Sequence, residues 1–397
     1  MAQVSIIRHN PIAIFSSPTE VIVKTDDNKV FRLVEPSGNV GTQYAGEVGS
    51  EWFGTIENLK AGLDVCGVHW SDVYKTDVMW TTPSSDREEC DERKNRFNAI
   101  YGAMINAVTG GPMRSNRMAR FSHQEGFPDP KALFEIQIKA VKGDGVTIGG
   151  GKIDYGSWVD HQPSGASVMH KKGDVMITTL GPDVAEEMRF VLEDQYEKPF
   201  AEQGVDFKTQ TIWMEILVAV DDDPANSWER MEVVRRVFEE YFGEHRPAGV
   251  IYPVSRIPNL DGIVEPQPRV VSGEVEIVRS GKLEDGFSTW AAANYGGVTD
   301  VMVSAAAGDD AGALLDTLDS RIKEAGGDGL KQDGVFNNAY IVAGADSAAS
   351  RAWIQKFNTS FSAWYEGTAP AGRTAQFVGG VQQPQHKSGI STRALFA

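Results

Sequence analysis

The fold is decided by an aromatic stretch that occurs three times: NAIYGAMI at residues 98–105, RRVFEEYF at 235–242 and NTSFSAWY at 358–365. Each stretch has helical spacing, and an extended segment follows it after a short loop. The central aromatic residues lie about 137 and about 123 residues apart. Solenoid repeats are only about 20–50 residues long, so a repeat of this length is a domain. The chain is therefore expected to hold three versions of one small domain.

Size and composition fit this division. The chain has 397 residues, of which 41% are hydrophobic, and three domains of about 130 residues each can build their own cores. No stretch approaches the roughly 18 apolar residues of a membrane span, and the N-terminus lacks the basic start and apolar core of a signal peptide. A cytoplasmic protein with no membrane partner is the expectation.

Charge and cysteine content exclude further classes. The net charge of -17 argues against nucleic acid as a partner, because phosphate binding needs a concentrated positive field. Two cysteines, Cys66 and Cys90, do not make a disulfide scaffold. His161 and His170 lack the paired spacing of metal ligands, so no metal and no cofactor is expected.

Each third alternates between helical and strand patterns. The predicted elements are a helix at 51–64, a strand at 72–80, a helix at 91–107 and a strand at 132–141; a hairpin at 167–177, a helix at 183–202, a strand at 211–218 and a helix at 227–242; a strand at 300–304, a helix at 311–325, a strand at 338–342 and a helix at 348–365. The alternation predicts an α+β fold in which each sheet carries two helices on one face. Glycine-rich joints at 143–151 and 280–286 place the domains at 1–145, with an N-terminal extension, 146–280 and 281–397.

In this order the chain resembles the Rid family, also called YjgF-type or L-PSP endoribonuclease-like. The residues that carry the resemblance are IENLKAGL at 56–63, WSDVYKT at 70–76, ALFEI at 132–136 and PAGRTAQFV at 370–378. Rid proteins are single domains of the chorismate mutase-like type that assemble as trimers. The resemblance implies a single-chain pseudo-trimer of three tandem Rid-like domains. Ring-opening amidohydrolases and chorismatase-type enzymes have similar architectures.

The resemblance also implies a site. Rid enzymes that hydrolyse enamines and imines hold the substrate carboxylate with an arginine, while a glutamate on the next strand activates water. In the first third these positions fall on Glu135, on Arg120 or Arg114, and on Asn98. A guanidinium binds a carboxylate through two hydrogen bonds, and a partly buried glutamate can exchange protons near neutral pH.

The other two thirds keep only part of this set. The last third has Asn358 and Arg373 but no glutamate on its following strand, and the middle third keeps only Glu265. We expect these three residues to bind substrate, and we expect one productive site per chain in a cleft between domains.

Two classes of function follow. The first is a cofactor-independent hydrolase of a small carboxylated nitrogen compound in catabolism, acting by enamine or imine deamination or by ring opening. The alternative is a non-catalytic Rid-like protein that binds or senses a small molecule. The substrate, the type of reaction and the formation of a homo-oligomer stay open at this point.

Overall fold

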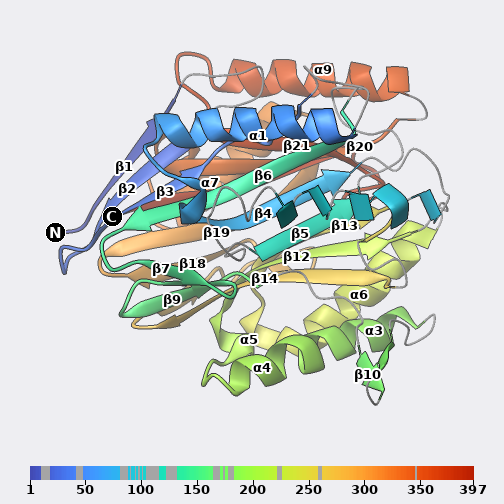
Figure 1. Ribbon diagram of the computed structural model, residues 1–397, viewed down its shortest axis with the longest axis horizontal. Helices are drawn as coiled ribbons and strands as arrows, with labels where there is room; N and C mark the ends of the chain where they lie inside the picture. Colours follow the sequence, from blue (N-terminus) through green and yellow to red (C-terminus); the bar gives the residue numbers. More distant parts are fainter. Residues whose placement is uncertain are drawn as a thin grey trace.

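The computed structural model describes residues 1–9, 18–41, 48–80, 88–89, 91–93, 95–96, 99–100, 102–103, 116–121, 132–163, 170–172, 175–177, 183–220, 226–257, 262–344 and 347–397. Their fold is mixed α+β and contains three six-stranded sheets (Figure 1). Among these residues no helix is both long and apolar enough to cross a bilayer.

The first sheet has the strand order β1-β2-β3-β6-β4-β5. Its elements, which we call unit 1, are β1 (Gln3–Arg8), β2 (Thr19–Lys24), β3 (Val30–Glu35), α1 (Val48–Val65), β4 (Val73–Trp80), β5 (Asn116–Phe121) and β6 (Phe134–Gly143). β4 and β5 run parallel, and β6 lies antiparallel between β3 and β4. The N-terminal residues are therefore no extension, because they supply three of the six strands.

The second sheet, in unit 2, repeats this order. Its elements are β7 (Thr147–Gly149), β8 (Lys152–Asp154), β9 (Trp158–His161), α3 (Val184–Phe190), α4 (Lys198–Ala201), α5 (Phe207–Gln210), β12 (Thr211–Ala219), α6 (Asn226–Phe242), β13 (Ala248–Val254) and β14 (Val264–Gly273). A separate hairpin pairs β10 (His170–Lys172) with β11 (Val175–Ile177). The glycine-rich joint includes the β7–β8 turn, where Gly150 and Gly151 have φ of 56° and 77°, a region that glycine enters without strain.

The third sheet, in unit 3, has the same order again. Its elements are β15 (Glu276–Arg279), β16 (Leu283–Glu284), β17 (Phe287–Ser288), β18 (Trp290–Tyr295), β19 (Val298–Gly308), α7 (Ala311–Glu324), α8 (Leu330–Asp333), β20 (Gly334–Val342), α9 (Ser347–Trp364), β21 (Gly372–Val378) and β22 (Ser388–Phe396). β15 already pairs with β18, so the third sheet begins before the expected boundary at 280.

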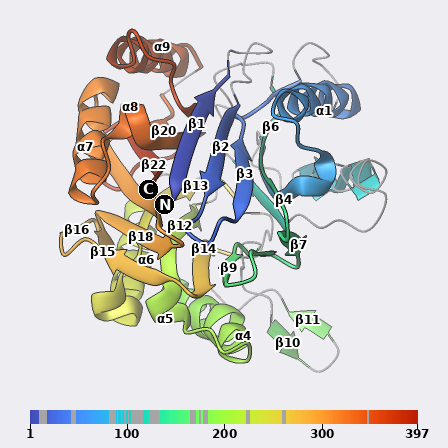
Figure 2. The ribbon, with the colours of Figure 1, turned by 90° about the vertical axis from the view of Figure 1, so that its left-hand side faces the viewer.

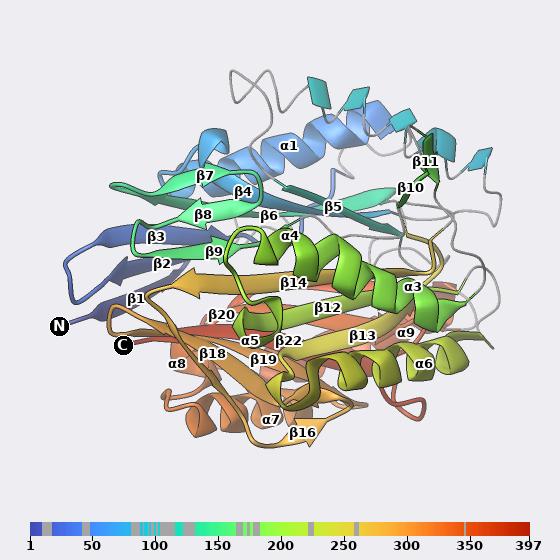
Figure 3. The same ribbon diagram turned by 90° about the horizontal axis from the view of Figure 1, so that it is seen from below.

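Each sheet buries two faces. Its outer face packs against its own helices, in clusters that join α1 to unit 1, α3 and α6 to unit 2, and α7 and α9 to unit 3. The inner faces of all three sheets share one further core, which includes Leu33, Trp213 and Leu395. Figures 2 and 3 show the result, with helices around the periphery and strands inside. Burial on both faces explains why β12 is apolar at nearly every position.

The strands β6, β14 and β22 carry polar side chains on their inner faces. Successive residues of a strand point to opposite faces. On β6 the outer residues belong to the helix-side core, which leaves Glu135, Gln137 and Lys139 on the inner face. The sheet registers place three rows in correspondence: Glu135-Gln137-Lys139, Glu265-Gln267-Arg269 and Gly389-Ser391-Arg393. The three cationic ends of these rows meet near the centre of the molecule.

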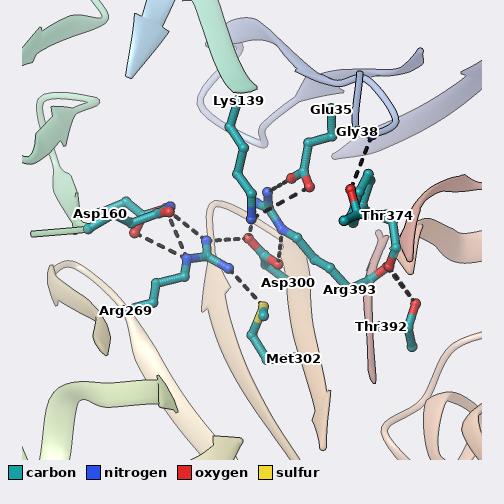
Figure 4. A network of polar contacts seen from close by, with 12 residues as sticks. Glu35, Gly38, Lys139, Asp160, Arg269, Asp300, Met302, Thr374, Thr392 and Arg393 are labelled. Carbon is teal, nitrogen blue, oxygen red and sulfur yellow. Dashed lines mark hydrogen bonds and ion pairs between the residues drawn. The ribbon is translucent and has the colours of Figure 1, made fainter. Parts of the chain in front are cut away.

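At this centre lies a chain of six charges of alternating sign, drawn in Figure 4: Asp160, Arg269, Asp300, Arg393, Glu35 and Lys139. Five of these residues are buried, and Lys139 is half-buried. Arg269 Nη2 lies 2.8 Å from Asp160 Oδ2 and 2.6 Å from Asp300 Oδ2. Arg393 Nη2 also lies 2.6 Å from Asp300 Oδ2, and its Nη1 binds Glu35. Lys139 Nζ ends the chain 3.8 Å from Glu35 Oε2. We call this set the axial charge chain.

The axial charge chain joins all three units and balances its own charge. Burial opposes ionisation of Asp300, but Arg269 and Arg393 outweigh it and hold its pKa below the usual range. Burial likewise opposes ionisation of Glu35, and Lys139 and Arg393 lower its pKa in spite of this. A charge buried in this way is tolerated only with its partner present, so the three units depend on one another.

We predict that Arg393→Met destabilises the protein by about 3–5 kcal/mol, the usual cost of leaving a buried charge without its partner. The measurement is the free energy of unfolding in urea. Lys60→Met is the control, since its pair with Asp64 is exposed on both sides and is worth less than about 1 kcal/mol. Equal effects of the two substitutions would contradict the structural role of the axial charge chain.

Stability should also fall in acid. The folded-state pKa values of Asp300 and Glu35 are lower than their values in the unfolded chain, which are about 4. Their contribution is therefore present above about pH 4 and is lost as the pH falls below it. Unfolding free energies between pH 7 and pH 3 test this prediction, and a stability that stays flat below pH 4 would refute it.

Candidate functional site

Glu135 is buried, with 7% of the residue exposed, on the inner face of β6. The start of its strand is fixed by Glu51 in the first turn of α1. Glu51 Oε1 accepts hydrogen bonds from the backbone N–H groups of Leu133, at 2.7 Å, and Phe134, at 3.4 Å. A carboxylate of the helix thus positions the carboxylate of the strand.

Arg373 approaches Glu135 from another unit. It lies on β21, the edge strand of unit 3, and its guanidinium carbon is 4.6 Å from the centre of the Phe361 ring on α9. Burial lowers the pKa of Arg373 to about 10, while Glu135 and then Tyr365 favour its charged form. Arg373 therefore stays a cation at neutral pH, next to the Glu135 carboxylate. We call this pair the Glu135–Arg373 site.

The segment after β3 closes the junction between the two units. The Arg373 backbone N–H donates to Ser37 Oγ at 3.1 Å, and the Gly38 N–H donates to Thr374 Oγ1 at 3.1 Å. A Cβ atom at Gly38 would lie 1.7 Å from Glu135 Oε1 and 2.8 Å from Thr374 Oγ1. Glycine is needed here because the Glu135 carboxylate lies against its Cα.

Polar groups of unit 3 surround the arginine. Asn337, which lies beside Arg373 in the β20–β21 register, donates from Nδ2 to the Tyr365 hydroxyl at 3.2 Å. Burial raises the pKa of Tyr365 to about 12, so its hydroxyl is neutral. The Oδ1 atoms of Asn337 and Asn358 are buried and have no hydrogen-bond partner among the described residues. The junction thus combines a cation, a carboxylate, a hydroxyl and amide oxygens.

The structure does not place the other predicted site residues next to Glu135 and Arg373. On β5 the backbone of Arg120 pairs with Met79, which also pairs with Glu135, so the Cα atoms of Arg120 and Glu135 lie about 10 Å apart. Arg120 stays a candidate for the site on register alone. Arg114 and Asn98 lie outside the described residues. Glu265 is buried on β14, away from this junction.

One expectation is corrected. Arg373 was expected to serve a site without a glutamate, because none follows it on the next strand of its own unit. The structure brings Glu135 of unit 1 to Arg373 instead. A site at a junction takes its two halves from different units, so spacing within one unit cannot show the pairing.

A sequence signal for this geometry exists but was missed. The segments EIQIKAV at 135–141 and EPQPRVV at 265–271 repeat the inner rows of β6 and β14, and EPSG at 35–38 repeats as QPSG at 162–165. On a buried strand, Glu, Gln and a basic residue at every second position lie on one face. These buried polar side chains need hydrogen-bond partners, which neighbouring units can supply.

The histidines offer little support for a metal. His161 bonds Ser272 Oγ at 2.8 Å, and burial lowers its pKa to about 4. Ligand atoms of His9, Glu20 and Cys66 lie within 4.8 Å of one another. Arg32 already pairs with Glu20 at 2.8 Å, and burial raises the pKa of Cys66 to about 12, which disfavours the thiolate a metal needs. His170 lies on β10, whose side chains are outside the described set.

The chain is similar to several solved structures. A chorismatase matches with 11% identity and a TM-score of 0.46 over 82% of this chain and 93% of its own. A cyanuric acid hydrolase matches with 9% identity and a TM-score of 0.42 over 92% and 99%. A member of the YjgF/YER057c/UK114 family from Mycobacterium tuberculosis matches with 17% identity and a TM-score of 0.24 over 31% and 100%. No protein-family model and no curated protein matches the chain.

We predict that Gly38→Ala displaces the Glu135 carboxylate, because the new methyl group would occupy the place of Oε1. Ligand binding or turnover at the site should fall at least tenfold, with the fold retained. Crystal structures of the variant and ligand titration measure the two effects. Gly62→Ala on α1 is the control, since its Cβ would meet only Pro36, at an ordinary 3.8 Å. An undisplaced carboxylate in the Gly38→Ala structure would contradict the prediction.

Proposed function

We propose that the chain is a cofactor-independent hydrolase of a small carboxylated nitrogen compound, acting by deamination of an enamine or imine or by ring opening. The observation that carries the proposal is the Glu135–Arg373 site, in which a half-buried cation and a buried carboxylate from different units interact electrostatically. A site of this kind can hold an anion with one group and move a proton with the other.

The proposal includes an arrangement of three Rid-like units around an approximate threefold axis through the axial charge chain. Its support is the common strand order of the three sheets and the correspondence of Lys139, Arg269 and Arg393. We place the units at 1–145, 146–275 and 276–397, which moves the second boundary to the start of β15.

Arg373 would bind the carboxylate of the substrate. Its guanidinium is held against the Phe361 ring, so little side-chain freedom is lost when the anion binds. The neutral Tyr365 hydroxyl and the Asn337 amide are suited to polar groups near that carboxylate. A planar conjugated acid fits this combination of a fixed cation and an aromatic face.

Glu135 would then exchange protons with water. In imine hydrolysis the water oxygen bonds to the imine carbon and the C=N π electrons move to the nitrogen. Glu135 accepts one water proton and passes it to that nitrogen, which gives a carbinolamine. Glu135 then accepts the hydroxyl proton and returns it to the nitrogen as the C–N bond breaks, so that ammonia leaves, a carbonyl group forms and Glu135 is a carboxylate again.

Glu135→Gln should lower turnover about 10²–10⁴-fold while preserving the shape of the site, because proton transfer is lost. Arg373→Gln should instead weaken binding, with KM raised about tenfold or more, since the charge-assisted contact with the carboxylate disappears. The assay follows ammonia release and loss of absorbance for a panel of carboxylated enamines and cyclic amides.

Glu274→Gln, at an exposed position after β14, is the matched control and should leave turnover unchanged. Normal turnover in Glu135→Gln would rule out its catalytic role. Carboxylates that bind through Arg373 without turnover of any member of the panel would indicate a binding protein instead of an enzyme.

A further inference from the structure

The strand registers allow the three junctions between units to be compared position by position. Arg373 is the second residue of β21 and pairs with Asn337. The same place is held by Gly249 on β13, opposite Met214, and by Arg117 on β5, opposite Thr76. The Gly249 N–H donates to Ser304 Oγ at 2.8 Å, as the Arg373 N–H donates to Ser37 Oγ at 3.1 Å. The same junction is therefore built at least twice.

The junction between units 2 and 3 is closed by an aromatic ring. Phe287 on β17 lies 4.6 Å from Phe238, which is the separation between the Arg373 guanidinium and Phe361 at the first junction. A Cβ atom at Gly249 would lie 2.5 Å from the Phe287 ring, so no arginine fits there. Phe287 thus takes the place of the guanidinium.

The carboxylate is missing from this closed junction as well. Gly389 on β22 corresponds to Glu135 on β6. Gly389 pairs with Tyr340 in the same way that Glu135 pairs with Met79. Ala305 corresponds to Gly38 of unit 1. The next residues show this, because Ala306 pairs with Ile390 and Asn39 pairs with Ile136, and these two isoleucines directly follow Gly389 and Glu135. Once the glutamate is absent, the residue against it no longer has to be glycine.

The junction between units 1 and 2 keeps the buried glutamate that the closed junction lacks. Glu265 corresponds to Glu135 and is buried, with 4% of the residue exposed. The start of its strand is fixed as in unit 1, because Glu187 Oε1 accepts from the N–H groups of Ile263, at 2.6 Å, and Val264, at 3.0 Å. Its carboxylate accepts from Gln267 Nε2 at 2.9 Å.

The sequence of unit 2 agrees with a retained site. QPSG at 162–165 matches EPSG at 35–38, so glycine is kept in the unit that keeps the glutamate and is replaced by alanine in the unit that lost it. Unit 1 supplies Arg117 at the strand position of Arg373. At each junction, the arginine, the glutamate and the glycine are therefore either all present in the sequence or all replaced.

We propose that the junction between units 1 and 2 is a second binding site for a small carboxylate, with Arg117, at the strand position that Arg373 holds on β21, as the cation and Glu265 as the carboxylate. The chain then has two sites of one construction and a third junction closed by Phe287. The class of ligand rests on the proposed function, whereas the number of sites rests on the registers and on Phe287.

The test counts bound 4-fluorobenzoate per chain by ¹⁹F NMR titration and locates it by soaking crystals of the full chain. The unmodified protein should bind two. Arg117→Gln and Arg373→Gln should each weaken one site about 10–150-fold and leave the other unchanged, and the double variant should lose both. Arg236→Gln, at an exposed position on α6, is the control and should keep two sites.

A second pair of variants should raise the affinity of each site for 4-fluorobenzoate instead of lowering it. Glu265→Gln removes a negative charge beside the bound anion and should tighten 4-fluorobenzoate at the junction of units 1 and 2 alone, whereas Glu135→Gln should tighten it at the other junction alone. This arm also serves if Arg117→Gln does not fold.

The outcomes separate the two proposals. One site that depends on Arg373 and ignores both Arg117→Gln and Glu265→Gln overturns the second site and leaves the proposed function intact. Binding that ignores Arg373→Gln overturns the proposed function. A third site that survives in the double variant shows that Phe287 does not close its junction.

Discussion

The axial charge chain is the interaction on which the rest of the structure depends. Six charges of alternating sign connect Asp160 and Arg269 of unit 2 with Asp300 and Arg393 of unit 3 and with Glu35 and Lys139 of unit 1. All of them except the half-buried Lys139 are buried. None of these groups can be buried at low cost without its partners. The chain therefore fixes the position of each sheet relative to the other two, and the apolar inner faces pack around it.

The positions of the candidate sites follow from the same rows of residues. Each inner row begins at a junction and ends at the axial charge chain, so Glu135 and Lys139 are opposite ends of one row on β6. A shift of the sheets at the axial charge chain would move Glu135 relative to Arg373. These charges thus help to position the residues of the candidate site although they lie outside it.

Local elements were predictable because they depend on local periodicity. The helices expected at 51–64 and 227–242 are α1 and α6, and the strand expected at 211–218 is β12. The first three strands of unit 1 were missed, although burial alternates along β1 as it should in a strand. Glu135, Arg373 and Asn358 could be named from the sequence because carboxylate, guanidinium and amide groups at strand and helix positions are chemically distinctive, and their roles in a site stay a prediction.

The sequence by itself determined the repeated order of helices and strands, the acidic charge and the residue types of the site. Only the tertiary structure decided that Glu135 meets Arg373, that Phe287 takes the place of an arginine at another junction, and that six charges from three sheets form one connected chain. The reason is physical. Periodicity reports which face of an element is buried, whereas the pairing of residues more than 200 positions apart depends on how three sheets pack together.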